Sequence, residues 1–466
     1  MPSATEPFRP AGSTRTEHDH NAGSNPGTLA HAALTLGFGC AAATWVAWLL
    51  LATPWWSLSP MAIGVGVIGI WMLASAWSGR FIAHLGPIRA GLTGGLAGLV
   101  TAAINVLLLG SKLVEAANPA DITQGEGVPH PDWPIAVGGF FIAGALIGGI
   151  GGVIGASGPR ARLADGQRWF ARFSLVSVLA TAPLLLLGGA VTSTESGMAV
   201  TGWPDTFGGN MFLYPISLMS EPRVFMEHAH RLFGAMVGLT ILTQWIFALL
   251  TLGTHRAESI IGVIAGAGII GAGFSVGGQT LGMIGVGVSG AAIAWTILSL
   301  FRGALTPAAG GLLVLVIAQG MLGGTRGTEV SSTLAIAHGV TGQVLAALAA
   351  SLALCAHAGY QTAVSVAKPP LKSSTLLVCT RFVQLAFGAS YRHLRRGDSP
   401  GASHALIAHI VLSLVVVVLA VLVGSILSGR KDQRDERPAG AVRVGKGLGH
   451  IVGLQFILGW LAFGVS

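Results

Sequence analysis

Charged residues are scarce in this chain, since Asp, Glu, Lys and Arg make up only 9% of its 466 residues. Soluble domains carry about 25%, so the composition excludes an ordinary soluble protein. Cysteine is scarce as well: its three copies, Cys40, Cys355 and Cys379, all lie in apolar runs. Because no Cys-x-x-Cys pair occurs, the sequence indicates neither an external disulfide nor a cysteine-based metal site.

Hydrophobic residues are abundant, at 52% of the chain with 69 glycines and a mean hydropathy of +0.70. Apolar runs long enough to cross a bilayer, about 17–25 residues, recur from Ala32 to Val465. We therefore predict an all-α, polytopic transmembrane helical bundle with about 11–13 spans. The expected helices cover residues 31–53, 61–78, 88–110, 134–157, 173–191, 223–251, 259–275, 279–301, 308–324, 333–357, 374–391, 404–427 and 448–464.

The basic residues sort by side when the loops are assigned alternately to the two faces of the membrane. One set of loops holds 18 of the 26 Lys and Arg residues, which marks it as cytoplasmic. Residues 1–30 are polar and lack an apolar signal segment, so they are expected to be a disordered cytoplasmic tail. We predict a bacterial-type inner (cell) membrane protein with a cytoplasmic N-terminus, in contact with lipid and not with nucleic acid.

A short repeat, Gln-x-x-x-Gly, recurs in the helices expected to run outward, at residues 319–323, 384–388 and 455–459. The copies lie 65 and 71 residues apart, about the length of a helix pair with its loops. Residues 184–188 fit the same place with Leu184 instead of Gln. The sequence therefore predicts pseudo-repeated helix pairs.

The repeats and the basic loops together suggest a domain organisation. Residues 31–158 form a four-helix N-terminal membrane extension, which ends at a run of arginines between 160 and 172. A first half follows at 170–358, with a helical hairpin inserted at 259–301, and a second half occupies 374–466.

Four ionisable residues, Glu227, His228, His230 and Arg231, lie together at one end of an otherwise apolar helix. Each ionisable group in a span costs roughly 2.5–3.5 kcal/mol on insertion scales, so the cluster requires partners or a function. Glu227, His230 and Arg231 share one helix face, whereas His228 points about 100° away from Glu227. His230 is thus directed to the same side as the acid and the guanidinium.

Histidines also occur at matching depth in the helices expected to run inward: His230, His338, and either His409 or His404. Haem iron takes axial histidines from opposed helices, so this pattern suggests planar prosthetic groups. A zinc site is disfavoured because no three or four ligands converge. An alternative for His230 is an uncharged interfacial residue that bonds Glu227, and the alternatives for Arg231 are to snorkel to the interface or to pair with a porphyrin propionate.

These motifs carry a family resemblance over residues 170–466. Glu227 to Arg231 fits a Glu-x-x-His-Arg motif and residues 202–205 read Gly-Trp-Pro-Asp. Residues 319–324 precede His338, and residues 384–388 precede Arg392-His393. The segment resembles the haem A synthase family of respiratory membranes.

The resemblance implies an eight-helix core of two four-helix halves. It implies that His230 and His338 flank the substrate, haem O, with Glu227 catalytic beside it, and that His409 ligates a haem b. The family oxidises a porphyrin methyl group to the formyl group of haem A for terminal oxidase assembly. Expected partners are the haem O synthase that supplies the substrate, an electron donor that the sequence does not identify, and a second copy of the chain.

The chain also departs from the family pattern. The four N-terminal helices and the 259–301 hairpin lie outside the family core, and the paired loop cysteines of some members are absent. The chain is expected to end after the seventh core helix, which leaves the second haem site one histidine short. Truncation, a vestigial site or a replacement ligand would each explain this.

Two other functions fit the composition: a transporter and a membrane cytochrome that only passes electrons.

Overall fold

The computed structural model describes residues 26–108, 110–158, 166–329, 331–357, 370–395, 399–429 and 439–465. Residues 1–25 of the predicted tail, and much of the basic loops around residues 160 and 434, lie outside the described residues. The first described helix begins at Pro26, inside the range predicted for the tail.

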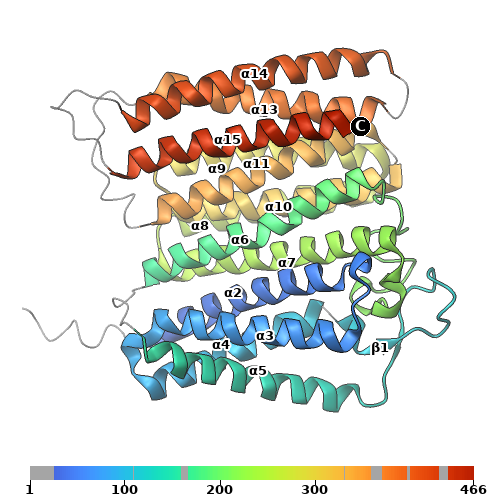
Figure 1. The fold of residues 1–466 in the computed structure, drawn as a ribbon, viewed down its shortest axis with the longest axis vertical. Coiled ribbons are helices and arrows are strands. Elements are labelled where there is room, and N and C mark those ends of the chain that lie inside the picture. The colour runs from blue at the N-terminus through green and yellow to red at the C-terminus, as the bar shows by residue number, and fades with distance from the viewer. Residues whose placement is uncertain are drawn as a thin grey trace, which may run out of the picture. The chain divides into compact units, whose positions relative to one another are not determined.

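The described chain is almost entirely helical (Figure 1). Its long helices are α2 (Pro26–Ala52), α3 (Pro60–Ser78), α4 (Pro87–Leu108), α5 (Trp133–Ala156), α6 (Gly166–Ser193), α7 (Pro222–Thr251), α8 (Arg256–Val276), α9 (Gly278–Phe301), α10 (Leu305–Glu329), α11 (Ser332–Ala356), α13 (Leu371–Leu394), α14 (Gly401–Ser428) and α15 (Ala439–Val465). Short 3-10 turns cover Pro54–Trp56, Gly79–Leu85, Gly110–Lys112, Met211–Leu213 and Ile216–Ser220. One small hairpin pairs β1 (Val114–Glu115) with β2 (Val128–Pro129).

Twelve of the described helices are long and apolar enough to cross a membrane. This finding confirms the predicted polytopic helical bundle, and the number of candidate spans lies within the predicted range of about 11–13. Helix α13 is not among the twelve, because Lys372, Arg381 and Arg392 lower its hydropathy. The last helix also differs from the prediction: α15 begins at Ala439 instead of near residue 448, so Arg443 and Lys446 belong to its first turns.

The chain divides into two compact units. One comprises Met1–Leu107 with Pro131–Val176, and the other comprises Leu108–His130 with Ser177–Ser466. The first unit therefore holds α2 to α5 and the beginning of α6, which is most of the predicted N-terminal extension. The predicted division of the second unit into two halves stays a prediction.

Glycine contacts bring two helices of the first unit very close together. A Cβ atom at Gly148 of α5 would lie only 2.8–2.9 Å from backbone atoms of Gly98 in α4, and it would overlap the Gly94 carbonyl. Small residues allow this backbone contact between helices in an apolar solvent. Polar pairs add to the packing: Trp45 donates its indole N–H to Asn105 Oδ1 at 2.9 Å.

In the second unit, α10 is the central helix. It packs against α7, α8, α9 and α11, and its spanning segment has the highest buried share among the candidate spans. Helices α8 and α9 form the predicted hairpin, with Gly266 against Val314 and Gly285 against Met321 of α10. Helix α13 joins α11, and α14 and α15 follow side by side (Figure 1).

The close contact in the first unit predicts a strong effect of one methyl group. Gly148→Ala should lower the free energy of unfolding by about 1–3 kcal/mol, because the added Cβ must push the α4 backbone away. The measurement is thermal unfolding of the purified protein in detergent. Gly139→Ala on the same helix is the matched control, since a Cβ there meets nothing within 4 Å and should shift stability by no more than about 1 kcal/mol. Equal melting temperatures for both variants would contradict the packing.

Candidate functional site

A cavity of about 910 Å³ lies within the second unit. Its wall is formed by α6, α7, α10, α11 and α13, and by the long loop between α6 and α7, residues 194–221. Four residues singled out in the sequence line this cavity: Glu227, His230, Arg231 and His338. His409 is not among its lining residues. The structure thus brings together the residues expected in the first half and leaves His409 in a separate place.

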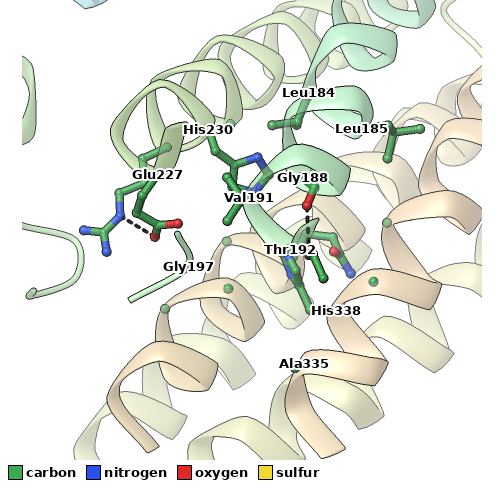
Figure 2. A pocket seen from close by; sticks show the side chains of 18 of the residues that line it. Leu184, Leu185, Gly188, Val191, Thr192, Gly197, Glu227, His230, Ala335 and His338 are labelled. Atoms are coloured by element: carbon green, nitrogen blue, oxygen red, sulfur yellow. Dashed lines mark hydrogen bonds and ion pairs between the residues drawn. The ribbon is translucent and has the colours of Figure 1, made fainter. Parts of the chain in front are cut away.

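The two cavity imidazoles come from different helices, His230 from α7 and His338 from α11 (Figure 2). Their ring centres are 6.4 Å apart and their planes are almost perpendicular, at 88°. Both side chains are half-buried. The helices therefore present two imidazoles to one another across a short gap, on the wall of a cavity.

Each candidate histidine packs against a glycine of the preceding long helix of its repeat. A Cβ at Gly188 would lie 3.2 Å from Cε1 of His230, and one at Gly323 would lie 3.2 Å from Cε1 of His338. A Cβ at Gly388 would lie 2.7 Å from Cε1 of His409. At these three positions the glycine is thus the surface on which an imidazole lies, and a side chain there would displace the ring, whereas a Cβ at Gly459, in the remaining copy of the repeat, would meet nothing within 4 Å.

His409 has its own hydrogen-bond arrangement. Its Nδ1–H donates to the carbonyl oxygen of Gln384 at 2.8 Å, which leaves Nε2 as the unprotonated nitrogen. Metal-bound histidines usually have such a bond on their other ring nitrogen. His404 is exposed, and its Nδ1 contacts the carbonyl of Pro400, the residue just before α14, at 3.2 Å. His409 is therefore bonded to another helix, α13, whereas His404 is bonded to the N-cap of its own helix; the choice between them as a ligand stays a prediction.

Arg231 donates hydrogen bonds through all three nitrogen atoms of its guanidinium. Its Nε donates to Oε1 of Glu227 at 3.2 Å, and its Nη1 donates to the carbonyls of Gly202 at 2.7 Å and Asp205 at 3.0 Å. Its Nη2 donates to the carbonyl of Val200 at 2.7 Å. These contacts use four of the five N–H groups of a guanidinium. Arg231 therefore fastens the 194–221 loop to α7 and pairs with the acid of the cavity.

Trp203 in this loop is held from two sides. Its indole stacks on Phe274 of α8, with ring centres 6.0 Å apart and planes within 4° of parallel. On the other side it lies directly against the backbone of Gly324 in α10, where a Cβ atom would overlap the indole ring. Helices α8 and α10 together position a residue that lines the cavity.

The 110–130 segment, which precedes α5, also packs on the 194–221 loop within the second unit. The Tyr214 hydroxyl donates to the Ile122 carbonyl at 2.9 Å, and the Gly127 N–H donates to the Leu213 carbonyl at 2.9 Å. Burial, with smaller contributions from Asp121 and Glu221, raises the pKa of Tyr214 to about 12. The phenol therefore stays neutral and keeps its donor over the whole physiological pH range.

His228 links this loop to α7. Its side chain is fully buried, its ring centre lies 5.0 Å from that of Tyr214, and its Nδ1 is 3.4 Å from the Thr206 hydroxyl. It faces the loop and does not line the cavity, in line with the prediction that it points about 100° away from Glu227. Its place in the packing supports a structural role.

Within the described ranges, no group of three or more His, Cys, Asp or Glu side chains converges to hold a metal ion. A haem needs fewer protein ligands, because the porphyrin supplies four nitrogens and leaves only axial positions. Two facing imidazoles are therefore a donor set suited to a metalloporphyrin.

No protein-family model matches the chain, and no solved structure matches it. A curated relative does match. It is a heme A synthase. This enzyme, from Lysinibacillus sphaericus (strain C3-41), is 36% identical over 100 residues, which are 21% of this chain and 30% of the relative. The chain thus matches less than a third of the length of that relative. The similarity and the fold agree on a multi-pass membrane protein.

Several residues of the site are not evident from the sequence. The glycines that support the imidazoles are signalled by the Gln-x-x-x-Gly repeat, although their contact with histidine is not. Arg392 and His393 of α13 line the same cavity as His230 and His338, a proximity that no spacing predicts. The contact of the 110–130 segment with the 194–221 loop has no sequence signal at all.

The position of Trp203 yields a test of the loop. Gly324→Ala should displace the indole and loosen the 194–221 loop, because the new Cβ occupies the place of the ring. Hydrogen exchange followed by mass spectrometry should show faster exchange across residues 198–210. Gly320→Ala, one turn earlier on α10, is the control, since a Cβ there only touches Trp203 at 4.0 Å. Unchanged exchange in Gly324→Ala would show that the loop does not depend on this contact.

Proposed function

We propose that this chain is a haem A synthase-like oxidoreductase of the bacterial inner membrane, with a cytoplasmic N-terminus. Its substrate is haem O, held in the cavity between His230 and His338, and its product carries a formyl group in place of one porphyrin methyl group. The observation that carries this proposal is the pair of imidazoles on separate helices, 6.4 Å apart, on the wall of a cavity of about 910 Å³.

The separation of the rings fits one metal ion between them. An imidazole nitrogen lies about 2 Å from a bound first-row metal ion, so two rings on opposite sides have centres about 6 Å apart. The cavity volume lies near the upper end of the 300–1,000 Å³ typical of ligand pockets, roughly what a large planar ligand requires. The partial similarity to a heme A synthase supports the same ligand.

His230 and His338 would hold the iron, and the iron porphyrin supplies the redox chemistry when bound. The protein contributes orientation and proton handling. Oxidation of a methyl carbon to a formyl carbon by oxygen insertion and loss of water requires protons to be moved near that carbon. Glu227 is the carboxylate on the cavity wall, with Oε1 held by Arg231 at 3.2 Å, so we assign proton transfer to it.

A second haem, haem b, would be ligated by His409 through Nε2. The hydrogen bond from Nδ1 to the Gln384 carbonyl supports this, because it fixes the ring with Nε2 as the coordinating nitrogen. Its role would be electron transfer between an external donor and the substrate site.

The role of Glu227 can be tested with one isosteric change. Glu227→Gln should bind haem O as the wild type does but convert it about 100-fold or more slowly, because an amide cannot accept a proton. The measurement is extraction and chromatography of haem after single turnover with a chemical reductant and oxygen. Glu258→Gln is the matched control, since Glu258 is a half-buried acid at the start of α8 that pairs with Arg302 and does not line the cavity.

The outcomes of that experiment differ in meaning. Conversion at the wild-type rate in Glu227→Gln would show that Glu227 does not take part in proton transfer. Tight binding of haem O without conversion by the wild type would indicate an electron-carrying cytochrome. A wild-type protein that binds no haem would contradict the proposal as a whole.

The ligand role of His338 predicts a loss of bound haem. His338→Ala should reduce the haem retained per chain by up to about half after purification, because one axial bond of the cavity site is removed while the site at His409 is unchanged. The pyridine haemochrome assay measures this amount. His404→Ala is the control, since His404 is exposed, bonds the carbonyl of the α14 N-cap residue Pro400 and does not line the cavity. Equal haem content in both variants would show that His338 is not a ligand.

A further inference from the structure

The cavity wall carries more positively than negatively charged side chains. Besides its histidines, the cavity is lined by one acid, Glu227, and by two arginines, Arg231 and Arg392. Glu227 pairs with Arg231. No carboxylate of the described residues lies within ion-pair distance of Arg392. A guanidinium on the wall of an apolar membrane cavity is costly without an anion, so the wall carries an excess of one positive charge.

Arg392 is held in place by α6. Its Nη2 donates to the carbonyl oxygens of Thr192 at 2.7 Å and Ser193 at 3.3 Å. These carbonyls end α6 and carry the partial negative charge of a helix C-terminus. The remaining donors, Nε–H and the two on Nη1, make no hydrogen bond to the described residues. The side chain is therefore held through Nη2, and the N–H groups of Nε and Nη1 remain to bind a ligand.

The α6 residue that binds Arg392 shows where Arg392 lies relative to the imidazoles. Gly188 packs on His230, and Thr192, whose carbonyl binds Arg392, follows one helical turn later (Figure 2). One turn of an α-helix advances about 5.4 Å. Arg392 thus lies about one turn from the level of the imidazole pair, toward the end of α6 where the 194–221 loop begins.

Resting on the proposed function, we infer that Arg392 binds a carboxylate of the porphyrin and is the residue that selects a carboxylate-bearing ligand for the cavity. The ligand class is a planar apolar macrocycle with acidic side chains. A guanidinium can grip a carboxylate through two parallel N–H donors. Arg231, which the sequence also suggests for this contact, has four of its donors committed to Glu227 and the 194–221 loop.

The test compares haem b with its dimethyl ester, which lacks both carboxylates but keeps the iron and the macrocycle. Wild-type protein should bind the free acid more tightly than the ester. Arg392→Gln should weaken binding of the free acid about 10- to 100-fold, the range expected for loss of a charge-assisted pair, and leave the ester affinity within about 3-fold. Arg392→Lys should recover part of the loss because it keeps the charge.

Arg395→Gln, three residues further on at the C-cap of α13, is the matched control. Arg395 is exposed, bonds the Tyr391 hydroxyl and does not line the cavity, so both affinities should stay at their wild-type values. If Arg392→Gln weakens both ligands equally, Arg392 only ties α13 to α6 and the inference is wrong. If the wild type binds neither ligand, the proposed function itself fails.

Discussion

The contact between an imidazole and a glycine backbone determines the geometry on which the rest of this site depends. His230 lies on Gly188 and His338 lies on Gly323, so close that a Cβ atom added at either glycine would lie 3.2 Å from Cε1 of the ring, tighter than an ordinary contact. A side chain at either glycine would have to push the ring away. Two helix pairs with the same internal contact, placed face to face, therefore bring their imidazoles to 6.4 Å. The site follows from repetition of one local packing arrangement.

A second constraint acts on the loop above this pair. The guanidinium of Arg231 donates hydrogen bonds to three loop carbonyls and to Glu227. Trp203 packs between Gly324 and Phe274. Loss of either contact would free the loop, while loss of Arg231 would also leave a buried acid without its partner, which is costly in an apolar region. The loop is thus part of the site and not a passive connection. Helix α8 and the 110–130 segment take part because both contact it.

Much of the fold follows from the sequence because hydropathy is a strong signal in membranes. Backbone polar groups must be satisfied within the span, so an apolar run of sufficient length becomes a helix. The hairpin predicted at 259–301 is observed as α8 and α9. Helix ends are less certain: α15 begins earlier than predicted because Arg443 and Lys446 are good helix formers and need not end a helix.

The site is predictable only in part. Spacing along one helix places Glu227, His230 and Arg231 on a common side, and the repeat suggests that His338 lies at the same depth. Neither pattern reveals that Arg231 is bound to the carbonyls of residues 200–205, or that Arg392 of α13 reaches the cavity. Such contacts join residues far apart in the sequence, up to 200 positions for Arg392 and Thr192, and depend on how the helices pack.

The most direct test of the central claim is electron paramagnetic resonance of the ferric, haem-loaded protein. Two axial imidazoles with planes near 88° should give the strongly anisotropic low-spin signal of perpendicular ligands, and this signal should vanish in both His230→Ala and His338→Ala. Absence of this strongly anisotropic signal in the wild type, or its survival in the two variants, would contradict the claim that these histidines face each other across one iron.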